Sequence, residues 1–233
     1  MAYREAGPNH YRRSAQPSRG SALRGLAGSG PPGSLLWTPP LVKINGIPSP
    51  ISAPAPNPAT WRRIPIASGS LGTSDTLRAM AGLAIEAVTD PWFVNEARSV
   101  VRGIPSKDYK QEADAMLQFA KEQVDYREDP IAPGLVNWIP SPGYLLGVDN
   151  QTNCAGLTVL LCALDLAIGK MCLERAVAVD PDFPGIYSHV FPVVYIGGVP
   201  YAQDAVPTPA RLGWEPPESE WTAPAMDYPV IVQ

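Results

Sequence analysis

Three residues of types that combine in nucleophilic catalysis stand in the second half of the chain: Cys154, His189 and Asp204. His189 lies in a β-branched run, and Asp204 follows a second such run across Gly197-Gly198, a pair typical of a hairpin turn. Directly opposed residues of that hairpin have numbers that sum to 395, and those of His189 and Asp204 sum to 393. We therefore expect the aspartate to orient the imidazole and the imidazole to accept the thiol proton, as in thiol acyl transfer.

Cys154 begins the most apolar segment of the chain, within the stretch Asn150–Gly169. The composition predicts a helix buried on nearly all sides, capped by Asn153 or Thr152 and ended by Gly169 in a left-handed conformation. The first turn of a helix is the positive end of its dipole and favours the thiolate, which is the nucleophilic form. The alternative interpretation is an inert, buried cysteine.

The remaining patterns place helices before this segment and strands after it. Capping residues and apolar spacing predict helices over residues 75–88 from a Ser74 cap, from Pro91 to a stop at Gly103, and over 107–124. Strands are predicted over 173–179, 187–196 and 199–205, with Pro192 and Pro200 indicating edges or bulges. This order, helices followed by a small antiparallel sheet, predicts an α+β fold.

Several of these segments together resemble the transglutaminase-like superfamily of papain-like cysteine acyl-transfer folds, and its phage and microbial branch in particular. The matching segments are Val124-Asp-Tyr-Arg-Glu-Asp-Pro130, Leu157-Thr-Val-Leu-Leu-Cys-Ala-Leu164 with its Ile168-Gly169 end, Tyr187-Ser-His-Val190 and Tyr201-Ala-Gln-Asp204. The resemblance covers about residues 95–206 and leaves the two ends of the chain outside it.

The resemblance implies that Cys154 is the nucleophile, His189 the general base and Asp204 the orienting acid. An oxyanion hole would use the Cys154 backbone N–H and a second donor, for which Gln151 and Trp138 are both candidates. The chain departs from the family beside the nucleophile, where members commonly carry acidic residues and a preceding glycine. Here the flanking residues are Asn153 and Ala155-Gly156, and Thr152 stands at the place of the glycine.

Charge and proline are distributed unevenly along the chain. Its 28 prolines in 233 residues exceed twice the average usage and concentrate at the ends. Residues 1–72 carry seven Arg and one Lys against one acid, a net charge of +7, whereas the remaining residues have a net charge of −11. We expect a basic, extended arm over 1–72, a transglutaminase-like domain over 73–206 and a Pro-rich tail over 207–233. By composition the arm is disordered unless neighbouring subunits or its own body order it.

These features predict a virion structural component, of a bacteriophage capsid, neck or tail, built on a cysteine peptidase or amidase domain. Its expected partners are other virion subunits, which the 1–72 arm and 207–233 tail would contact, and a peptide or amide substrate. Its expected location is the virion, assembled in the bacterial cytoplasm. Two alternatives are a free, soluble transglutaminase-like cysteine peptidase and a protein whose basic arm contacts nucleic acid.

No cofactor or metal is expected. Cys162 and Cys172 are interpreted as core residues, because no close Cys-x-x-Cys pair accompanies them and Cys162 falls in the middle of the apolar helix. The odd number of cysteines does not suggest a disulfide framework. No membrane segment is expected either, since the longest apolar run is far shorter than the roughly 20 residues that span a bilayer.

Overall fold

The computed structural model describes residues 43–44, 47–48, 69–128 and 139–231. The chain divides after Pro40, and everything described belongs to the unit Leu41–Gln233. Two short strands, β1 (Lys43–Ile44) and β2 (Ile47–Pro48), pair antiparallel. The rest of the predicted arm up to residue 68, including its role in docking to neighbours, lies outside the described residues.

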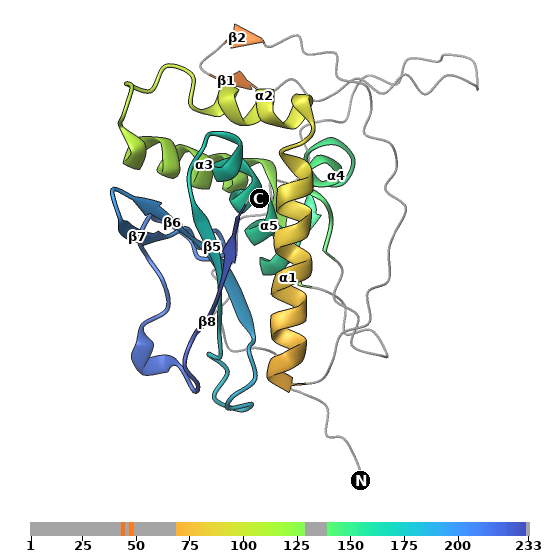
Figure 1. Ribbon diagram of the computed structural model, residues 1–233, viewed down its shortest axis with the longest axis vertical. Coiled ribbons are helices and arrows are strands. Elements are labelled where there is room, and N and C mark those ends of the chain that lie inside the picture. Colours follow the sequence, from red (N-terminus) through yellow and green to blue (C-terminus); the bar gives the residue numbers. More distant parts are fainter. Residues whose placement is uncertain (1–42, 45–46, 49–68, 129–138, 232–233) are drawn as a thin grey trace, which may run out of the picture. The chain divides into compact units, whose positions relative to one another are not determined.

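The helices surround one central member, α5 (Cys154–Ala167), which contacts each of the others. Every residue of α5 from Ala155 to Asp165 is buried, as the apolar composition predicts. Figure 1 shows this helix between the sheet and the long helix α1. The surrounding helices are α1 (Gly69–Ala87), α2 (Pro91–Val100), α3 (Tyr109–Gln123) and α4 (Pro142–Gly147).

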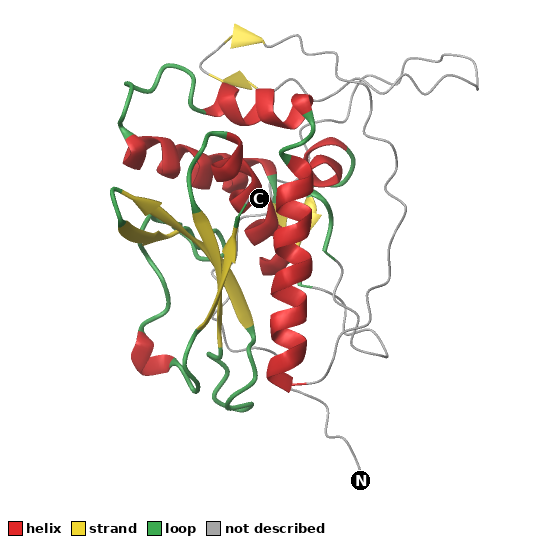
Figure 2. Ribbon diagram, viewed as in Figure 1, coloured by secondary structure: helices red, strands yellow, loops and turns green. Residues whose placement is uncertain are grey.

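Four of the strands form an antiparallel sheet in the order β7-β6-β5-β8. Its members are β5 (Cys172–Val177), β6 (His189–Ile196), β7 (Val199–Ala202) and β8 (Met226–Val230). Gly197 and Gly198 both have positive φ, at 60° and 82°, which a two-residue hairpin turn between β6 and β7 requires. The architecture is therefore α+β (Figure 2).

A second, two-stranded pair lies at the start of α5. In it β3 (Asp125–Tyr126) runs parallel to β4 (Gln151–Thr152). The chain leaving α3 is thus joined by backbone hydrogen bonds to the segment that enters α5. One such bond runs from Arg127 N to Thr152 O, at 2.7 Å. This pairing fixes the position of Cys154 relative to the end of α3.

Apolar side chains cover both faces of the four-stranded sheet. Cys172, Ala176 and Val230 join the helices in the main core, so the helical layer covers that face. Leu173, Val177, Phe191, Val193 and Ala202 form a smaller core, against which Trp221 and Ala225 pack. The chain between β7 and β8 therefore covers the second face, while 3₁₀ turn η1 (Glu218–Glu220) lies within it.

The helix boundaries differ from the prediction at several points. Helix α1 begins at Gly69, so Ser74 lies inside the helix and does not cap it. Lys107 has φ of 71°, a left-handed conformation that excludes it from a helix, and Asp108 caps α3 by accepting from Gln111 N. The predicted start of α2 at Pro91 is confirmed, and Asp90 caps the helix by accepting from Trp92 N. Helix α4, capped by Ser141, was not predicted because prolines and glycines surround it.

The region after residue 206 contributes more than the predicted tail. Strand β8 lies within it and pairs with β5, although Pro229 interrupts its β pattern, as β8 is an edge strand. Pro200 also lies in an edge strand, β7, as predicted. Pro192, by contrast, lies in the inner strand β6. The proposed boundaries at 72/73 and 206/207 stay predictions.

Candidate active site

The polar turn before α5 places Cys154 at the first position of the helix. Asn153 is the cap: its Oδ1 accepts from the backbone N–H groups of Ala155, at 3.0 Å, and Gly156, at 3.2 Å. The cap thus takes the second and third amides of the helix, while the first, that of Cys154, has no acceptor within the helix. When the Cys154 sulfur attacks a carbonyl carbon, this N–H can donate a hydrogen bond to the oxyanion that forms.

The far end of α5 is fixed as firmly as its start. Gly169 has φ of 80°, and the N–H of Lys170 reaches back to Asp165 O at 2.9 Å. Gly169 N also donates to Leu166 O at 3.0 Å, which completes a Schellman motif. The prediction that Gly169 ends this helix is confirmed, and Cys154 is carried on a buried helix closed at both ends.

Gly156 is held as glycine by the turn that precedes the helix. A Cβ at this position would clash with the side chain of Thr152, Oγ1 above all. Thr152 is 6% exposed and packs into the first turn of α5. Sequence reasoning noted both residues only as departures from the family pattern, and their contact gives each a structural role.

His189 and Asp204 lie together as the hairpin register predicts. His189 Nε2 and Asp204 Oδ2 are 2.7 Å apart, and the two side chains are 8% and 2% exposed. Asp204 Oδ1 accepts from Val206 N at 3.0 Å, so the second carboxylate oxygen is also engaged. Pro192 has no N–H to donate, so the β6–β7 pairing ends with a single bond, from Gln203 N to Pro192 O.

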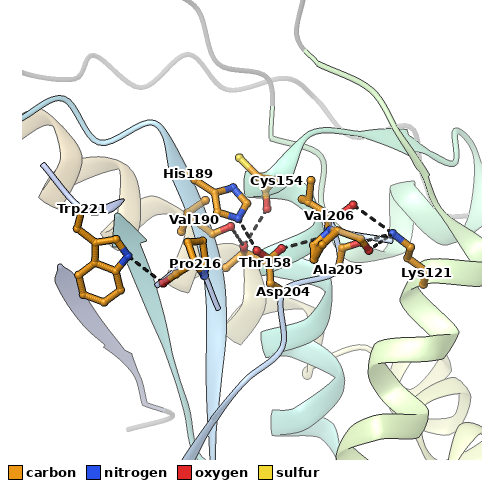
Figure 3. Close-up of polar contacts among 11 residues, drawn as sticks. Lys121, Cys154, Thr158, His189, Val190, Asp204, Ala205, Val206, Pro216 and Trp221 are labelled. Carbon is orange, nitrogen blue, oxygen red and sulfur yellow. Dashed lines mark hydrogen bonds and ion pairs between the residues drawn. The ribbon is translucent and has the colours of Figure 1, made fainter. Parts of the chain in front are cut away.

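The environment of His189 favours its charged form. Burial acts to lower the pKa of the imidazole, but the charge and hydrogen bond of Asp204, with a smaller contribution from Cys154, outweigh it and raise the pKa to about 10. Because Nε2 is engaged by Asp204, Nδ1 is the ring nitrogen left to exchange a proton with the thiol. Figure 3 shows Cys154 on the side of the ring opposite Asp204. At neutral pH His189 is therefore an imidazolium, placed beside the Cys154 thiol.

Thr158 joins the turn that carries the cysteine to the strand that carries the histidine. Its Oγ1 lies 2.8 Å from Cys154 O and 3.1 Å from Val190 O, and its one proton is shared between these two acceptors, which links α5 to β6 (Figure 3). Sequence reasoning missed this residue. The available signal was its position one helical turn after Cys154, as the polar member of an otherwise apolar run.

The structure describes only one of the two candidates for the second oxyanion donor. Gln151 lies in β4, exposed, and its Oε1 accepts from Arg127 at 2.9 Å. Trp138 lies outside the described residues. The second oxyanion donor stays a prediction for both. Cys162 and Cys172 are buried, at 0% and 4% exposure, and unpaired by disulfides.

Metal ligation and membrane insertion find no support in the described part of the chain. Residues 69–128 and 139–231, with the two short strands before them, hold no group of three or more His, Cys, Asp or Glu side chains placed to bind a metal ion. Among the helices described, none is long and apolar enough to cross a membrane.

No protein-family model and no curated protein matches the chain. Among solved structures, the chain is similar to calcium-bound LapG of Legionella pneumophila, with a TM-score of 0.39 and 17% sequence identity over 58% of this chain and 76% of that one. Similarity at this level carries no argument about function. The α+β assignment rests on the helices and strands described above, and the phage branch stays a prediction.

Proposed function

We propose that this chain is a cysteine acyl-transfer enzyme of the transglutaminase-like type, acting as a peptidase or amidase. The observation that carries the proposal is the buried His189–Asp204 pair at 2.7 Å, beside a cysteine on the first turn of a buried helix. Nucleophile, base and orienting acid come from helix α5, strand β6 and the segment after β7, and each is held by contacts of its own. This is the arrangement that thiol acyl transfer requires.

In the proposed reaction the Cys154 thiolate attacks the carbonyl carbon of an amide. The oxyanion that forms accepts a hydrogen bond from the Cys154 backbone N–H, and the His189 imidazolium donates its proton to the departing amine. The thioester is then attacked by water, from which His189 takes a proton, or by a second amine. Asp204 stays ionised throughout and stabilises the imidazolium.

The test is the formation of an acyl-enzyme. The protein is incubated with p-nitrophenyl acetate, quenched in acid, digested and analysed by mass spectrometry for an acetyl group on the Cys154 peptide. Cys154→Ser should abolish the adduct, and Cys172→Ser, which changes a buried thiol of the core, should leave it. Acetylation that spares Cys154 in the parent protein would contradict the proposal.

A role as a virion component is a second proposal, compatible with the first. Its support is the contrast between a proline-rich arm of net charge +7 and a body of net charge −11, which suits an arm lying on acidic surfaces of neighbouring subunits. Partners would be other subunits, contacted by the 1–72 arm and the 207–233 tail, and the location would be the virion. Size-exclusion chromatography with limited proteolysis tests it, since a monomer with a protease-resistant arm would contradict it.

A further inference from the structure

The segment that follows Asp204 curves around a single ammonium group from a neighbouring helix. Lys121 Nζ donates to the carbonyl oxygens of Ala205 at 2.7 Å, Val206 at 3.2 Å and Pro207 at 2.8 Å. An ammonium has three N–H donors, and these three bonds use them all. Figure 3 shows the lysine reaching from its helix to this curve on the side of Asp204 away from the histidine.

The lysine is well anchored. It lies at the end of α3, where Met116, Leu117 and Ala120 are fully buried in the main core. Burial lowers the pKa of Lys121, while the negative charge of Asp204 opposes that effect. The ammonium therefore lies close enough to the carboxylate to sense its charge, although its hydrogen bonds go to the backbone.

We propose that Lys121 is a positioning residue of the candidate active site, which holds residues 205–207 in the curve that presents Asp204 to His189. This inference rests on the proposed function for its relevance to catalysis, but its geometry stands without it. The β6–β7 pairing has ended at Pro192, so the sheet no longer holds the chain at Asp204. Beyond the end of the strand pairing, the three hydrogen bonds from Lys121 to carbonyl oxygens hold the chain instead.

The inference is tested by the titration of His189. Within the described part of the chain, the groups that face its ring include the Cys154 thiol from α5, the Asp204 carboxylate after β7 and the uncharged ring of Phe191, 5.6 Å away between centroids. The chain has two histidines, so His10→Gln leaves His189 as the only imidazole signal in a proton NMR titration. This measurement requires neither a substrate nor activity.

Lys121→Met distinguishes positioning from simple electrostatics by the sign of its effect. Loss of a nearby positive charge alone raises the pKa of an imidazole, whereas displacement of Asp204 lowers it. We expect a downward shift of at least one pH unit in Lys121→Met, and a titration close to that of the parent in Lys121→Arg, which keeps charged donors. Lys110→Met, on the exposed side of α3 over the Tyr201 ring, is the matched control and should leave the titration unchanged.

An unchanged or raised His189 pKa in Lys121→Met would overturn the inference. If that variant does not fold, Lys121→Gln serves in its place: its amide donates to at most two of the three carbonyl oxygens, and the same downward direction is required. A protein that shows the expected shift but forms no acyl-enzyme would refute the proposed function and leave the positioning role of Lys121 intact.

Discussion

Asp204→Asn removes one charge from the candidate site and keeps the shape of the side chain. The amide oxygen of the substituted side chain can still accept a hydrogen bond from His189 Nε2, which keeps the orientation of the ring, but the amide nitrogen cannot accept the bond from Val206 N. The carboxylate charge, which is the largest influence raising the imidazole pKa to about 10, is lost. Burial then dominates, and the pKa of His189 falls. The imidazolium no longer supports a thiolate on Cys154 at neutral pH.

The size of the effect follows from the ionisation of an unassisted thiol. Such a thiol has a pKa of about 8.5, so about 1% of it is thiolate at pH 6.5 and about half at pH 8.5. In the parent protein the imidazolium is fully formed at pH 6.5, and the proposed mechanism pairs it with a thiolate. The rate of Cys154 alkylation should therefore fall about 100-fold at pH 6.5 and about twofold at pH 8.5.

Alkylation by iodoacetamide, followed by mass spectrometry of the Cys154 peptide, measures these rates residue by residue. Cys162 and Cys172 are buried and serve as internal references that should not react in the folded protein. Asp227→Asn is the matched control, because Asp227 pairs with Arg175 on the sheet and not with His189. Parallel pH profiles for Asp204→Asn and the parent would refute the thiolate–imidazolium pair.

Two further variants test the Thr158 link next to the site and a buried carboxyl of the sheet. Thr158→Val removes the hydroxyl that bridges Cys154 O and Val190 O, and should cost about 1–3 kcal/mol in urea unfolding and slow Cys154 alkylation; unchanged values for both would exclude the bridge. Glu174→Gln replaces a carboxyl whose oxygens are buried without hydrogen-bond partners and whose pKa burial raises to about 9. Because that pKa is raised above the usual 4.5, the free energy of unfolding of the parent falls by about 1.4 kcal/mol per pH unit as pH rises from about 4.5 to about 9. The stability of Glu174→Gln relative to the parent, measured by urea unfolding, should therefore increase over that pH range and stay constant outside it.

Local chemistry explains which features the sequence could predict. The Asn153 cap, the Gly169 end, the buried α5 and the glycine turn each depend on a few adjacent residues, and all are found. The same turn sets the register that brings His189 and Asp204 to one end of the hairpin, although the strand pairing stops before Asp204. These are short-range consequences of residue type.

Contacts between distant elements were not predictable in this way. Lys121 lies 84 residues before the first carbonyl that it contacts, and its sequence neighbourhood is typical of a solvated helix face. Strand β8 pairs with β5 from within a proline-rich region because an edge strand tolerates the proline. In both cases the determining partner is set by the tertiary fold, which a local pattern does not contain.

Thr152 and Gly156 are in contact at the turn that carries Cys154. The Thr152 side chain occupies the space that a Cβ at position 156 would enter, and Gly156 makes room for it. Gly156→Ala should therefore destabilise the fold by about 1–3 kcal/mol through overpacking, although alanine is otherwise the better helix former by about 1 kcal/mol.

Removal of the Thr152 side chain should reverse the sign of the effect that Gly156→Ala has on the free energy of unfolding. In a Thr152→Gly background, Gly156→Ala should become neutral or stabilising, because the added methyl group then enters vacated space. A double-mutant cycle by urea unfolding measures the coupling, expected to be about 1–3 kcal/mol for residues in direct contact. Additive effects would show that Thr152 and Gly156 do not constrain one another. A strong coupling would show that Thr152 and Gly156 together constrain the turn that carries Cys154.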